Sequence, residues 1–108
     1  MEGKNDAAQR LVDLKNETRN ITRLMSNVRR IHPSKWMKRV RHDLLDLLNS
    51  QSPVSEAIMT GCLLLKLKEA IDSMDAAMNI SRSEQLAHAR EYTVRILDRF
   101  SEDILIRK

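Results

Sequence analysis

The chain is interrupted at only three places where a helix would have to end. Proline marks the first two, which are His32-Pro33-Ser34 and the turn at residues 49–53, and the third is the polar run 81–84. A residue before proline is pushed out of the helical region, and a neighbouring serine supplies a helix cap. Between these breaks, apolar residues recur every three or four positions, which is the spacing of one face of an α-helix.

The spacing predicts an all-α fold, either a four-helix bundle or a pair of helical hairpins. Ser34 is expected to cap the second helix, and Ser52 the third, with Pro53 in its first helical position. Ser81 and Glu84 are expected to form a capping box at the start of the fourth. One domain is expected over residues 1–108, with helices at about 6–30, 35–48, 53–78 and 82–106.

The third expected helix carries apolar residues on two opposite sides. One side holds Val54, Ala57, Ile58, Cys62 and Leu65, and the other holds Leu63, Leu67, Ala70, Ile71, Met74 and Met78. A helix that is apolar all round is buried by more than one neighbour. We therefore expect this helix to serve both an internal core and the contact of a homodimer. The alternatives are a kink at Gly61 and a contact with a different protein.

Acidic residues are absent from the 25 residues between Glu17 and Asp43, which include eight Lys or Arg. The formal charge is +5 over residues 1–52 and −1 over residues 53–108, within a total of +4. Such an asymmetry indicates a polyanionic partner.

The cations of this block lie away from the apolar faces of the first two expected helices. On the first helix, Arg19, Arg23 and Arg30 of the block, together with Lys15 just before it, fall within about 80° of one another around the axis, and asparagines flank them. The predicted phosphate contacts are Lys15, Arg19, Arg23, Arg30, Lys35, Lys38, Arg39 and Arg41. The predicted hydrogen-bond donors to ribose or phosphate are Asn16, Asn20 and Asn27.

The small number of aromatic residues favours duplex RNA as the ligand. Proteins that bind single strands stack bases on several exposed aromatic rings, whereas this chain has only Trp36, Tyr92 and Phe100. Duplex RNA is recognised mostly through its shape, its phosphates and its 2′-hydroxyls. We expect a non-enzymatic protein that binds double-stranded RNA through basic helix faces.

In size and character, though not in any sequence motif, the chain is similar to small helical dimers that present basic helices to duplex RNA. These include the nodavirus suppressors of RNA silencing and the RNA-binding domain of the influenza nonstructural protein. The similarity implies a small viral-type suppressor of RNA silencing. The alternative is a helical adaptor or oligomerisation module that binds an acidic protein, with an anionic membrane surface or a merely solvated basic face ranked behind it.

No constellation of residues predicts catalysis or cofactor binding. The chain lacks a glycine-rich phosphate loop, its three histidines are scattered, and Cys62 is its one cysteine, so neither an enzyme nor a metal site is expected. The polar start of the sequence predicts no secretory signal, and no apolar run is long enough to span a membrane. An intracellular protein is expected, with the cytoplasm favoured over the nucleus.

Overall fold

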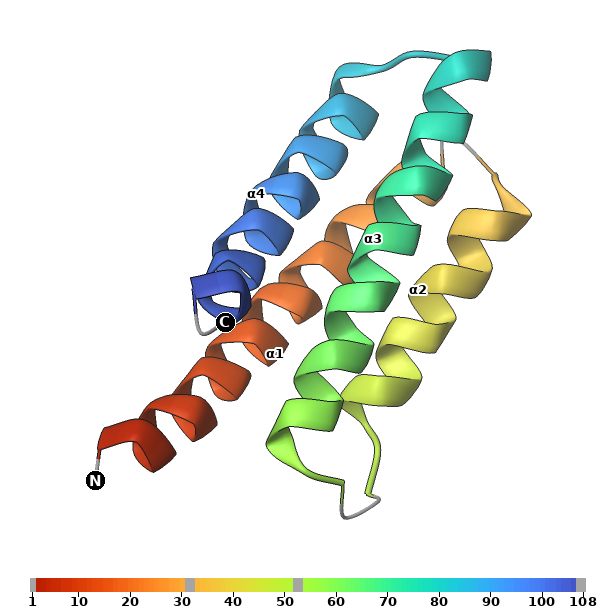
Figure 1. Ribbon diagram of the computed structural model, residues 1–108. Coiled ribbons are helices and arrows are strands. Elements are labelled where there is room, and N and C mark those ends of the chain that lie inside the picture. The colour runs from red at the N-terminus through yellow and green to blue at the C-terminus, as the bar shows by residue number, and fades with distance from the viewer. Residues whose placement is uncertain (1, 31–32, 52–53, 107–108) are drawn as a thin grey trace.

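The computed structural model describes residues 2–30, 33–51 and 54–106, and within them it has four helices and no strand. The helices are α1 (Glu2–Arg29), α2 (Lys35–Leu48), α3 (Glu56–Ile80) and α4 (Glu84–Ile106). α1 packs against all three other helices, while α2 and α4 lie on either side of α3 and do not contact each other (Figure 1). The predicted all-α helical bundle is confirmed.

Serine caps define where α2 and α3 begin. Ser34 Oγ accepts a hydrogen bond from the Met37 N–H at 3.2 Å, as the sequence predicted. α3 begins at Glu56 rather than near residue 53, because Ser55 Oγ accepts from the Ile58 N–H at 3.1 Å. The predicted cap and first helical residue, at positions 52 and 53, lie outside the described residues.

The predicted capping box at the start of α4 is wrong. Ser83 Oγ accepts from the Leu86 N–H at 3.1 Å, so the cap lies two residues after the expected one. Ser81 instead closes the end of α3, where its N–H donates to the Ala77 carbonyl at 3.0 Å. α1 also differs from the prediction, since it begins at Glu2 rather than near residue 6.

The core lies where the apolar faces of the four helices meet. Its fully buried side chains include Leu14, Ile21, Met37, Leu44, Leu63, Leu67, Met74 and Leu86. Two buried threonines, Thr18 and Thr93, each donate a hydrogen bond from the hydroxyl to a carbonyl of the same helix, at 2.7 and 2.8 Å. In the described part of the chain, every buried side-chain nitrogen or oxygen has a hydrogen-bond partner.

Only one of the two apolar sides of α3 is used by the core. Leu63, Leu67 and Met74 are fully buried, whereas 72% of Leu65 and 58% of Ile58 are exposed. α3 is a single uninterrupted helix through Gly61. The fold therefore leaves an apolar row on the outer side of a helix whose inner side forms the centre of the bundle.

Two leucines of α3 test this division of the helix. Leu63→Ala should lower the free energy of unfolding by about 2–5 kcal/mol, because it leaves a cavity in a fully packed site. Leu65→Ala is the matched control and should change it by no more than about 0.5 kcal/mol. Urea denaturation followed by circular dichroism measures both values, and equal losses would contradict the burial pattern.

Candidate nucleic-acid interface

The apolar stripe of α1 determines which way its cations point. Burial of Leu14, Ile21, Met25 and Val28 turns the opposite side of the helix outward. Arg19, Arg23 and Arg30 are exposed on that outer side, and Lys15 is half-buried at its edge. Around the helix axis, these four positions fall within about 80° of one another, opposite the buried stripe.

α2 brings two more cations to the same place. The Arg41 Nε donates to the Thr22 carbonyl of α1 at 3.3 Å, so this half-buried side chain lies across the junction of the two helices. Lys38 precedes Arg41 by three positions, shares its side of α2 and is exposed. Arg19 and Arg23 flank Thr22 on α1, so cations from both helices meet along one junction.

We call this junction the basic seam and define it by six residues. They are Lys15, Arg19, Arg23, Arg30, Lys38 and Arg41. Two other predicted phosphate contacts, Lys35 and Arg39, are exposed but lie farther around α2. Arg39 is two positions from Arg41, which places it about 160° away around the helix axis. Of the predicted cations, Arg41 is tied to α1 by a hydrogen bond, the others are placed by their exposure and helical spacing, and the binding role of all eight stays a prediction.

The carboxylates nearest to the basic seam in sequence point away from it. Glu17 turns to α4, where it accepts a hydrogen bond from the Tyr92 hydroxyl and lies 3.7 Å from Arg99. Asp43 turns to α3, and Asp46 pairs with His42 on its own helix at 3.6 Å. Among the described residues, no carboxylate forms an ion pair with a cation of the basic seam. Its positive charge is therefore not neutralised by ion pairs within the described part of the chain.

Two arginines of the basic seam form hydrogen bonds to neutral amide groups instead of to carboxylates. Arg19 Nη1 donates to the Asn16 amide oxygen at 3.1 Å, and Arg23 Nη1 donates to that of Asn20 at 3.4 Å. An amide orients a guanidinium without neutralising its charge. Arg41 likewise donates from Nε to a backbone carbonyl, which is a neutral acceptor.

The three predicted asparagines fall in two different environments. Asn16 and Asn27 are exposed on the outer side of α1. Asn20 is half-buried towards α4, where its amide nitrogen donates to the Tyr92 hydroxyl at 3.3 Å and to Glu17 at 3.4 Å. Burial, followed by the hydrogen bond to Glu17, raises the pKa of Tyr92. Asn20 thus links Arg23 to the α1–α4 contact rather than presenting its amide to the seam.

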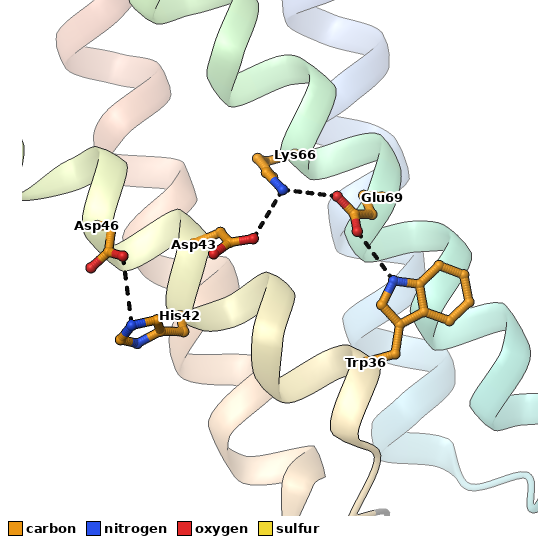
Figure 2. Close-up of polar contacts among 6 residues, drawn as sticks. All are labelled: Trp36, His42, Asp43, Asp46, Lys66 and Glu69. Atoms are coloured by element: carbon orange, nitrogen blue, oxygen red, sulfur yellow. Dashed lines mark hydrogen bonds and ion pairs between the residues drawn. The ribbon is translucent and has the colours of Figure 1, made fainter.

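A polar network on the other side of α2 explains why Asp43 does not neutralise the seam (Figure 2). Lys66 Nζ of α3 donates to Asp43 at 2.9 Å and to Glu69 at 3.0 Å, and Trp36 Nε1 donates to Glu69 at 3.2 Å. These bonds raise the pKa of Lys66, chiefly through Asp43, and lower the pKa of Glu69, chiefly through Lys66. Sequence reasoning missed this network, because residues 33 positions apart carry no local signal of pairing.

Comparisons with known protein families, with curated proteins and with solved structures found no match for this chain. None of the helices, over their described residues, has an apolar stretch that could cross a membrane. In the same part of the chain, no three His, Cys, Asp or Glu side chains gather as a metal site would require. The fold and the surface therefore define a class only, that of a small four-helix bundle with a basic seam.

The only tryptophan of the chain reports on the network through its bond to Glu69. Because the pKa of Glu69 is lowered from 4.5, its contacts stabilise the fold above pH 4.5 and are lost as the pH falls below that value. Trp36 fluorescence should change with a midpoint below pH 4.5. Lys66→Met should move the midpoint up, since it removes the main cause of the shift, and Glu69→Gln should abolish the transition. A midpoint at or above 4.5 in the unaltered protein would contradict the assignment.

Proposed function

We propose that the protein binds RNA through the basic seam, with duplex RNA preferred. The support for the proposal is a set of six exposed or half-buried cations from the α1 and α2 segments, beside a junction that Arg41 spans, while Glu17 turns to α4 and Asp43 to α3. Lys and Arg gain affinity for nucleic acid by neutralising phosphates and releasing condensed counterions. Lys15 and Arg30, which directly follows α1, are 15 positions apart, or about 22 Å at the rise of an α-helix.

The positions of the aromatic residues support a duplex over a single strand. Trp36 faces Glu69 of α3, Tyr92 bonds to Glu17 at the α1–α4 contact, and Phe100 is buried. None of the three lies in the basic seam, so the seam offers phosphate contacts without a stacking platform. A protein that covers duplex RNA without reading its bases would act by sequestering it. We include in the proposal the role of a viral-type suppressor of RNA silencing.

Salt-dependent binding to a panel of nucleic acids tests this proposal. Lys38→Ala should weaken binding to duplex RNA to a similar extent for every sequence, and should reduce the slope of log affinity against log salt by about 1. Lys68→Ala is the matched control, because Lys68 is exposed on α3 outside the seam and its loss removes the same charge. Fluorescence anisotropy with duplex RNA, single-stranded RNA and duplex DNA gives these values.

Two results would overturn the RNA proposal. One is an affinity for duplex RNA that does not change between low and high salt. The other is an equal loss for Lys38→Ala and Lys68→Ala, since net charge rather than the seam would then be responsible. Binding to none of the nucleic acids would favour the alternative function, in which the seam docks an acidic protein.

The outer side of α3 carries a second proposal, that of a contact with another chain. Ile58 and Leu65 are exposed there, and 46% of Val54 is exposed just before the helix begins. Exposed apolar side chains that line one side of a helix are candidates for an interaction site. The sequence predicted a second copy as the occupant, with a different protein as the alternative.

Sedimentation of the purified chain distinguishes the two occupants of α3. A homodimer should give a concentration-dependent rise in mass towards twice 12.5 kDa, and Leu65→Ser should abolish it. A compact monomer at high micromolar concentration would exclude the homodimer and leave the other protein as the occupant.

A further inference from the structure

A shallow groove runs between α2 and α3, on the side of α2 that is turned away from the basic seam. It has a volume of about 770 Å³. Leu47 of α2 and Cys62 and Leu65 of α3 supply its apolar lining. Asp43, Asp46, Lys66 and Glu69 lie around that lining, and Figure 2 shows the four side chains on the two facing helices. We call this feature the α2–α3 groove.

The apolar lining of the groove continues along the outer side of α3. Ile58 and Leu65 are seven positions apart, so they project from the same side of the helix two turns apart. Gly61 lies between them, and a Cβ at that position would meet no atom within 4 Å. Among the described residues, the packing around Gly61 leaves room for a side chain, and glycine is one of the weakest helix formers. Its effect is to leave a low, open strip beside the groove.

The charge of the groove selects the chemistry of its occupant. Three carboxylates face one ammonium, and Lys66 is already shared between Asp43 and Glu69. Asp46 has only the exposed imidazole of His42 beside it. The groove is therefore apolar in its lining and negative at its rim, which complements a helix with apolar residues on one side and Lys or Arg beside them.

A second copy of the chain fits this surface less well. A two-fold contact uses the same patch on both subunits, so one negative rim would lie against an identical one. Like charges brought together at an interface cost several kcal/mol against a partner of opposite charge. The charge pattern thus favours a basic partner helix over a second copy of the chain. The exposed apolar row of α3 alone did not distinguish these two occupants.

We propose that the α2–α3 groove binds a basic amphipathic helix of a partner protein. The apolar side of that helix lies on Leu47, Cys62, Leu65 and Ile58, and its Lys or Arg side chains reach Asp46 and Glu69. Binding uses residues outside the basic seam, so this site is independent of the one proposed for RNA.

Trp36 provides the measurement, because its indole donates to Glu69 at the rim of the groove. The full chain is titrated with a synthetic helical peptide of about 18 residues, built from Leu and Lys with no aromatic residue. Two matched control peptides test whether binding requires positive charge and amphipathic spacing. One replaces Lys with Glu, and the other keeps the composition but scrambles the amphipathic spacing. The Lys peptide should change Trp36 fluorescence saturably, and the other two should bind at least tenfold more weakly.

Three variants localise the binding to the groove. Leu65→Ser should weaken the Lys peptide about tenfold, and Asp46→Lys should do the same through reversed charge. Ile80→Ser is the control, since 89% of Ile80 is exposed on the same helix but away from the groove. Circular dichroism checks that each variant is folded. Leu65→Ser and Ile80→Ser leave the charge unchanged and should bind duplex RNA as the unaltered chain does, so failure here is separable from failure of the RNA proposal.

Several outcomes would overturn the groove proposal. Equal binding of the Lys and scrambled peptides would show a merely electrostatic attraction, and equal binding of the Lys and Glu peptides would remove the charge complementarity. If none of the three peptides binds, the proposed site is rejected. A dimer seen in sedimentation that Leu65→Ser dissociates, and that the Lys peptide does not displace, would assign the groove to a second copy.

Discussion

Burial of the apolar stripe of α1 against its three neighbours is the constraint on which the rest of the surface depends. α1 contacts α2, α3 and α4, so these three neighbours together fix its rotation about its own axis. With Leu14 and Ile21 fully buried, Arg19 and Arg23 have no orientation open to them except outward. The position of the basic seam is thus a consequence of core packing, and no additional structural element is needed to hold it.

α2 separates the charges of the molecule because each of its two flanks meets a different helix. Arg41 reaches the Thr22 carbonyl of α1, whereas Asp43 reaches Lys66 of α3. Two positions along a helix differ by about 160° around the axis, so these adjacent charges of opposite sign face different neighbours. The acid that ends the acid-free block is therefore removed from the seam, and the negative rim of the α2–α3 groove is formed at the same time.

Periodicity predicted the helices well, while the choice among competing local signals required the fold. Ser34 stands alone beside Pro33, and its cap was predicted correctly. Serines recur before α3 and before α4, and each has the chemistry to cap, so the sequence did not distinguish Ser83 from Ser81. Of the site, the row on α1 followed from helical spacing. The meeting of Lys38 and Arg41 with that row, and the departure of Arg39 from it, depend on how α2 is rotated against α1, which no local pattern encodes.

Two charged regions of opposite sign lie on the two sides of α2, and under the proposals above each would disfavour the other's ligand. The cations of the basic seam lie on one side, and Asp43, Asp46 and Glu69 lie around the groove on the other, within a chain whose formal charge is +4. A polyanion approaching the groove meets Asp46 and Glu69, and a basic helix approaching the seam meets Arg19 and Arg23. Each wrong pairing places like charges together and is disfavoured at the encounter stage, before any close packing forms. A domain with a single basic face would lack this discrimination, because its other side would be neutral to both ligands. Glu17 and Asp43, which bond to α4 and α3, therefore contribute to the separation of charge as well as to the fold.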